Sequence, residues 1–148
     1  MKLLCKKAWV GLILLVALSS GVFGWMLLSN TNGDSPRIIT RENLRFGISK
    51  TVYTRGETVT FWIKNVGDKN ISELIWEIDK KTADGWKPVF TPVTILVHGS
   101  VKPGEKVTWH WQQKANGETE LVDPGVYRVV FFPHTENPVT LPFTIEKE

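Results

Sequence analysis

Two hydrophobic patterns divide the chain. Residues 8–28 are mostly apolar and carry no charge, and a helix of about 20 such residues spans the hydrocarbon core of a bilayer. From residue 43 onward, apolar and polar residues alternate with period two between turn residues, which is typical of short strands with one buried face. The pattern predicts one N-terminal transmembrane helix followed by an all-β domain.

The flanks of the apolar segment predict its orientation. Lys2, Lys6 and Lys7 precede it, and Trp9 and Trp25 stand near its two ends. Positive charge is retained on the cytoplasmic side, and tryptophan is enriched at membrane interfaces. We therefore expect a cytoplasmic basic tail (residues 1–7), a bilayer-spanning anchor (8–28) and an extracytoplasmic remainder, in a single-pass protein of the cell membrane.

Two other fates of the apolar segment stay open. A signal peptide would be cleaved after small residues such as those in 17–19 or 22–24. Residues 6–8 (Lys-Lys-Ala) faintly resemble the processing site of archaeal pilins. We favour an uncleaved anchor because cleavage at residue 19 would leave the apolar residues of 22–28 on a soluble product.

The rest of the chain divides into a tether and one domain. Residues 29–42 are polar and include Gly33 and Pro36, which predicts a tether. Residues 43–148 are enough for one domain with a core, and Asp84-Gly85 is a strong hairpin signal. The alternation predicts seven or eight strands, at 44–48, 58–64, 73–79, 86–90, 93–97, 107–111, 127–131 and 139–145.

Three turn-and-strand motifs suggest a family. Residues 53–57 (Tyr-Thr-Arg-Gly-Glu) lead into 59–61, residues 101–105 (Val-Lys-Pro-Gly-Glu) lead into 107–109, and residues 122–129 contain Asp-Pro-Gly-Val-Tyr. In this order they resemble bacterial and archaeal immunoglobulin-like domains, and most closely the intracellular proteinase inhibitor (BsuPI-like) type. The resemblance covers about residues 44–146 and implies an Ig-like β-sandwich of antiparallel strands.

The third motif also predicts a local contact. Asp123, Gly125 and Tyr127 match a tyrosine corner, in which the tyrosine hydroxyl reaches back to the backbone at a sandwich corner. We assign these three residues a structural role.

Charge counts exclude a nucleic-acid partner. The chain has 18 Lys and Arg against 15 Asp and Glu. Three of the cations precede the apolar segment and every acidic residue follows it, so the external part is formally neutral. A nucleic-acid-binding domain usually carries a clear positive excess, so the basic pI reflects orientation in the membrane.

Candidate chemistry is sparse. The three histidines, His98, His110 and His134, are scattered, and the only cysteine, Cys5, precedes the apolar segment. No motif for a nucleophile, a phosphate loop or a zinc site occurs. The carboxylates in 73–79 alternate with apolar residues, which predicts a solvated strand face. We expect no enzyme activity, no metal and no cofactor.

Tryptophan and one asparagine are the remaining candidates. Trp62 falls on the face opposite the apolar residues of its strand, and Trp86 follows a hairpin turn. Either side chain is therefore available for a partner. Packing against an edge strand is the simpler explanation for both. Asn70-Ile71-Ser72 matches the N-glycosylation pattern.

These observations favour a membrane-anchored extracytoplasmic module that binds or scaffolds another protein of the cell envelope. The alternatives are a proteinase inhibitor, implied only by the resemblance, a pilin-like filament subunit, and a carbohydrate-binding module based on Trp62 and Trp86.

Overall fold

The computed structural model describes residues 33–72, 74–93 and 100–148. The predicted tail and anchor lie outside these residues, as does most of the strand expected at 93–97. Within the described ranges, no helix has the length and hydrophobicity needed to cross a membrane. The described part of the chain is all-β, as predicted.

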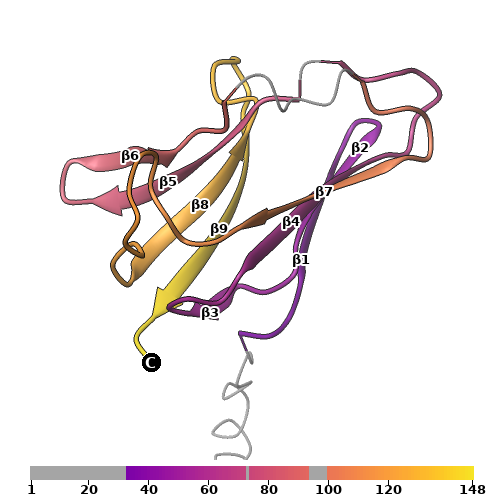
Figure 1. Ribbon diagram of the computed structural model, residues 1–148. Helices are drawn as coiled ribbons and strands as arrows, with labels where there is room; N and C mark the ends of the chain where they lie inside the picture. The colour runs from indigo at the N-terminus through magenta and orange to yellow at the C-terminus, as the bar shows by residue number, and fades with distance from the viewer. Residues whose placement is uncertain (1–32, 73, 94–99) are drawn as a thin grey trace, which may run out of the picture. The chain divides into compact units, whose positions relative to one another are not determined.

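Nine strands form in the described residues (Figure 1). They are β1 (Arg37–Arg41), β2 (Leu44–Ile48), β3 (Val52–Thr54), β4 (Val59–Asn65), β5 (Trp76–Thr82), β6 (Gly85–Phe90), β7 (Lys106–Trp111), β8 (Gly125–Phe131) and β9 (Val139–Glu146).

The strands make two sheets. Sheet A has the order β1-β2-β4-β7 and sheet B the order β3-β9-β8-β5-β6. All pairs are antiparallel except β3 with β9. The expectation of antiparallel strands alone is therefore wrong at β3, which is too short to show a period and pairs with the last strand of the chain.

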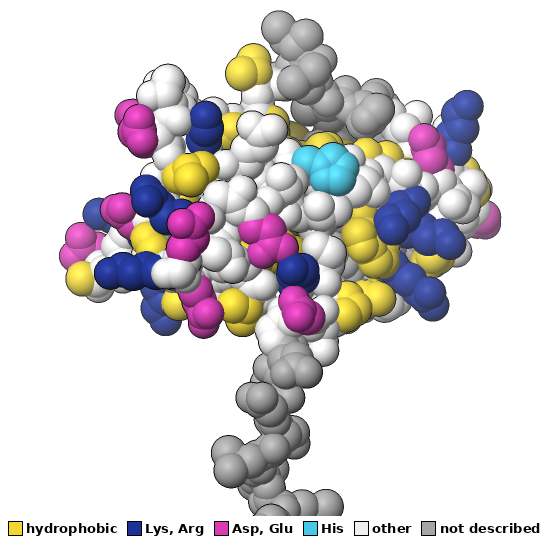
Figure 2. Space-filling view, turned by 60° about the horizontal axis from the view of Figure 1, so that its bottom comes forward, with side chains coloured by type: hydrophobic (Ala, Val, Ile, Leu, Met, Phe, Trp, Pro, Cys, Tyr) yellow, Lys and Arg dark blue, Asp and Glu magenta, His cyan; other side chains and the backbone are white. Residues whose placement is uncertain are grey.

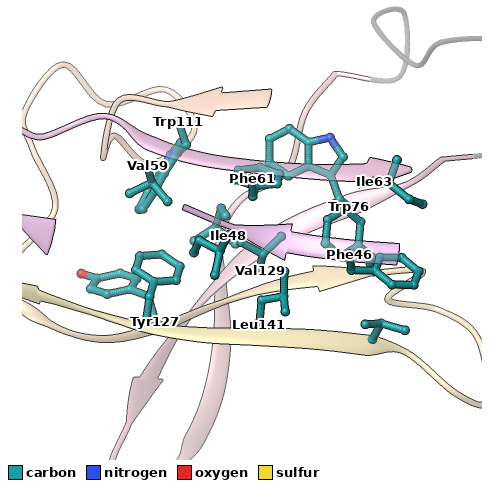
Figure 3. Packing of buried hydrophobic residues seen from close by; sticks show 14 of the residues in the cluster. Phe46, Ile48, Val59, Phe61, Ile63, Trp76, Trp111, Tyr127, Val129 and Leu141 are labelled. Carbon is teal, nitrogen blue, oxygen red and sulfur yellow. The ribbon is translucent and has the colours of Figure 1, made fainter. Parts of the chain in front are cut away.

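The core lies between the sheets, because the central strands turn their apolar alternate residues inward (Figure 3). Phe61 of sheet A meets Trp76 and Phe131 of sheet B, with ring centroids 4.8 and 6.0 Å apart. Trp111 and Tyr127 close the cluster, with centroids 5.9 Å apart. Burial of these large side chains is the main source of stability in a domain that contains no cysteine.

The N-terminal boundary of the domain differs from the prediction. Arg37–Arg41, which we assigned to the tether, form β1 and pair along their whole length with β2. The polar composition of residues 29–42 suggested a tether, but an edge strand can also be polar. It is held by backbone hydrogen bonds on one side and keeps much of its surface in water. A tether reaching to residue 42 is therefore wrong.

The hairpin and the tyrosine corner have the geometry that their sequences favour. Thr82 pairs with Gly85 across the β5–β6 turn, and Gly85 has φ +114°, a conformation that disfavours other residues. The Tyr127 hydroxyl donates a 2.5 Å hydrogen bond to the backbone carbonyl of Asp123. Burial raises the pKa of Tyr127 to about 12, and the nearby Asp123 carboxylate adds to this shift.

Candidate functional site

Trp62 lies on the outer face of sheet A, as its register predicts, and it is only partly exposed. Its indole fills the space beside Gly47, the residue opposite it on β2. The Lys106 ammonium lies over the ring, 4.4 Å from the centroid. The ring is thus already engaged by a backbone and a cation of the same chain, which leaves little of it for stacking on a sugar.

Trp86 is engaged in a similar way on the outer face of sheet B. The Arg128 guanidinium lies 4.4 Å from the ring centroid, and the Lys81 ammonium lies 5.8 Å from it. Arg128 Nε donates a hydrogen bond to Asp79 Oδ2 at 2.8 Å, and Nη2 of the same guanidinium lies 2.8 Å from that oxygen in an ion pair. Trp86 is therefore one end of an intramolecular Trp–Arg–Asp arrangement.

The carboxylates of β5 are not a solvated face. Glu77 is 9% exposed and Asp79 only 3%, so the prediction from alternation is wrong for both residues; Glu73 lies outside the described residues. Burial raises the pKa of Glu77, and the negative charge of Asp79 raises it further. Asp79 Oδ1 has no hydrogen-bond partner among the described residues. Alternation failed here because it reports which side of a sheet faces the core and not whether the other side is covered.

The remaining sequence candidates stay apart. Asn70 is exposed in the segment after β4, the placement that a glycosylation acceptor needs. His110 is exposed on sheet A, where its Nδ1 lies 3.1 Å from the Thr60 hydroxyl, and His134 is exposed between β8 and β9. His98 lies outside the described residues. In the described ranges, no three potential metal ligands come together.

An open cleft, which the sequence did not reveal, lies where the β1–β2 turn meets the β8–β9 loop. Its volume is about 470 Å³. The apolar lining consists of Leu44, Phe46, Phe132 and Val139, and the polar lining of Arg41, Glu42, Thr135, Glu136 and Asn137. An Arg41 Nη1 donates to the carbonyl of Asn137 and ties the two sides of the cleft together. We call this site the end cleft.

The backbone of the end cleft is unusual. Phe132 has φ +55° and Glu42 has φ +51°, values that are rare for residues other than glycine. Phe132 is held there by its N–H to the Ile75 carbonyl at 2.9 Å and by the Thr135 hydroxyl, which donates to the Phe132 carbonyl at 2.9 Å. Its ring meets Phe46 edge-on at 6.2 Å. Strained residues of this kind concentrate at binding and catalytic sites.

One sequence signal pointed toward this cleft. Phe131 and Phe132 are adjacent, and only Phe131 fits the inward alternation of β8, with an exposed fraction of 1%. A second bulky aromatic directly after a strand has no place in the same core face. The other cleft residues come from separate turns, whose approach no local pattern encodes.

Comparisons with known proteins do not assign a family. No family model matches the sequence, and no curated protein matches it significantly. Among solved structures, a mutant beta-glucosidase from Listeria innocua in complex with laminaribiose is 21% identical over 76% of this chain and 16% of its own, with a TM-score of 0.47. The Listeria innocua enzyme in complex with gluconolactone is 21% identical over 69% of this chain and 16% of its own, with a TM-score of 0.41.

A more distant similarity is to the alkylpurine DNA glycosylase AlkC of Pseudomonas fluorescens bound to DNA containing an abasic site analog. It is 11% identical over 72% of this chain and 31% of its own, with a TM-score of 0.39. This chain spans about a sixth of the length of the glucosidases that it matches. Similarity at this level carries no inference about function.

Proposed function

We propose that the chain is a membrane-anchored, extracytoplasmic Ig-like module without catalytic activity that binds another protein of the cell envelope. The charge-free residues 8–28 behind a basic tail support the location. The two-sheet arrangement and the Tyr127–Asp123 hydrogen bond support the Ig-like assignment.

The end cleft is the observation that carries the binding function. It joins an apolar lining to a rim with both signs of charge, and it lies on loops fixed by two sheets. A protein partner inserts apolar anchor side chains into pockets of this type and satisfies its polar groups at the rim. The rim charges, Arg41, Glu42 and Glu136, differ in sign, which favours a mixed protein surface over a simple anion or cation.

Site-specific photo-crosslinking in the source cells tests the proposal. A crosslinking amino acid is placed at Thr135, on the rim, and in a matched variant at Ala83, an exposed residue of the β5–β6 turn. We expect a discrete protein adduct from position 135 that is absent from position 83 and weakened by Glu136→Arg. Absence of an adduct at 135, or equal adducts at both positions, would contradict binding at the end cleft.

N-terminal sequencing of the native protein tests the anchor separately. An intact start supports a retained anchor, whereas a start at about residue 20–25 indicates a cleaved signal peptide and a start at Ala8 indicates pilin-like processing.

A further inference from the structure

The outward face of sheet A concentrates positive charge. Its register places Arg45 opposite Lys64 and Lys64 opposite Lys106, on three neighbouring strands. Neighbouring strands lie about 5 Å apart, so the three residues form one row across the sheet. The outward positions of β1, β2, β4 and β7 contain no acidic residue.

Charge repulsion within this row opposes folding, although Lys106 also contacts the Trp62 ring. Like charges directly opposite one another in a sheet are destabilising. Among the described residues, none of the three cations is in a salt bridge, whereas the pairs found elsewhere include Arg128 with Asp79 and Lys80 with Asp123. Figure 2 shows Lys and Arg side chains gathered with hydrophobic ones on the flank that carries sheet A, with Asp or Glu at its upper edge, and charges of both signs mixed on the opposite flank. A row without counter-charge suits an anionic partner.

Apolar side chains lie beside the row. The neighbouring register row contains Ile38, Gly47, Trp62 and Thr108, and Ile38 is 57% exposed. Trp62 is partly exposed beneath the Lys106 ammonium. Tryptophan and an exposed aliphatic residue next to Lys and Arg form the combination that places a surface at the headgroup level of a bilayer.

We propose that this surface, the cationic face (Ile38, Arg45, Trp62, Lys64 and Lys106), lies against the anionic headgroups of a lipid bilayer. The proposal rests on the anchor of the proposed function, because only eight residues separate the predicted anchor, ending at Leu28, from Arg37, where β1 begins. Gly33 already belongs to the domain, because its carbonyl accepts hydrogen bonds from the N–H groups of Thr51 and Val52 at 2.9 and 3.1 Å. The four residues that remain, 29–32, can reach at most about 14 Å. An anchored domain therefore meets its own membrane at a high effective concentration.

Charge favours a bilayer over an acidic protein as the occupant. The three cations follow one register row on three neighbouring strands, so each can meet a separate headgroup without a defined partner geometry. Each Lys or Arg near an anionic surface strengthens binding about fivefold. Removal of all three is expected to weaken the contact roughly 100-fold, and high salt is expected to have the same direction of effect.

An environment-sensitive fluorophore on the full chain tests the contact. In a Cys5→Ser background, Thr108→Cys carries the probe on the cationic face, and Ala83→Cys carries it on the β5–β6 turn as a control. The chain is reconstituted into phosphatidylcholine vesicles with or without about one-third phosphatidylglycerol, a content that gives a strong negative surface potential. We expect a blue shift at position 108 only in anionic vesicles and low salt, and none at position 83.

Charge variants complete the test. The triple change Arg45→Gln, Lys64→Gln and Lys106→Gln should abolish the shift. A control that loses the same charge elsewhere should retain it: Lys81→Gln, Lys87→Gln and Lys147→Gln. A shift independent of lipid charge, no shift at all, or equal loss in both triples overturns the proposal. A crosslinker at Thr108 in the source cells tests the other occupant: a protein adduct that the Arg45, Lys64 and Lys106 triple variant loses, with a probe that stays in water on vesicles, assigns the face to an acidic protein and overturns the lipid contact.

Failure of this inference is distinguishable from failure of the proposed function. An intact N-terminus with an unshifted probe overturns only the lipid contact. If sequencing shows cleavage, the mature chain is sedimented with the same vesicles, and binding that requires anionic lipid supports the face whereas its absence overturns it. The crosslink at Thr135 reports on the end cleft in either case.

Discussion

The contact between Gly47 and Trp62 makes a quantitative prediction. A Cβ at position 47 would lie 2.3 Å from Cε2 and Cζ2 of Trp62 and 2.7 Å from its Nε1. Carbon atoms pack at about 3.5–4.0 Å, so in Gly47→Ala the indole must retreat by more than about 1 Å. The backbone of Gly47 itself is not left-handed, so the added methyl group is resisted by the ring and not by φ.

Two opposing energies determine whether Gly47→Ala stabilises or destabilises the fold. Inserting a methyl group into a filled site costs about 1–3 kcal/mol, whereas alanine is better than glycine inside a strand by roughly 0.5–1 kcal/mol. Gly47→Ala should therefore lower the free energy of unfolding by about 1–2 kcal/mol. In a Trp62→Thr background the same change should raise it by about 0.5 kcal/mol, because the ring is gone.

A double-mutant cycle measures this coupling. Urea unfolding of the full chain in mild detergent, followed by far-UV circular dichroism, gives the four free energies, and the coupling should be about 2 kcal/mol. Equal effects of Gly47→Ala in both backgrounds would refute the argument that the indole occupies this site. Ala83→Gly, an exposed change remote from the ring, controls for the general effect of swapping these residues.

Three further predictions concern buried polar groups, each measured by urea unfolding. Tyr127→Phe should cost about 1 kcal/mol. Because the folded pKa of Tyr127 is near 12 and an unfolded tyrosine titrates near 10, the stability difference from wild type should be constant below pH 10 and shrink from pH 10 to 12. A difference that grows in that range would contradict the prediction. Gln113→Leu should cost roughly 2–4 kcal/mol, because the fully buried amide donates to the carbonyls of Thr54 and Glu57 at 2.9 and 2.7 Å; a loss below about 1 kcal/mol would show that water replaces it. Arg128→Met should cost about 2–3 kcal/mol, less than for a wholly buried pair, because it leaves the 3%-exposed Asp79 without its cationic partner. Adding Asp79→Asn should restore most of the lost stability. If no stability is recovered, the ion pair is not the cause of the loss.

Alternation along the strands was a reliable guide wherever one face of a strand meets the core. Val107, Trp109 and Trp111 turn inward on β7, and His110 turns outward. Phe61 likewise faces the core while Trp62 does not. These positions were predictable because burial of one sheet face imposes period two on the residue types.

The sequence misled where the structure depends on contacts far along the chain. β3 joins β9 through Val52–Thr54, which pair with residues more than 90 positions away. Asp79 is buried because Arg128, on a different strand, lies against it. The end cleft likewise combines two turns that meet only in three dimensions, so apart from the adjacent Phe131 and Phe132 no local pattern marks its walls, and none marks its charged rim.

The β-domain is formally neutral, and it hides its charge asymmetry for the same reason. Arg45, Lys64 and Lys106 are separated by 19 and 42 positions in the sequence, and no single stretch around any of them shows a basic cluster. Sheet register brings them into one row, and it also places Asp79 beside Arg128 on the other sheet, where opposite charges cancel. A net charge of zero is therefore compatible with one face that attracts anions, because pairing on sheet B removes charges that sheet A leaves uncompensated. It follows that changing Arg128 should affect stability, whereas changing Arg45 should affect binding.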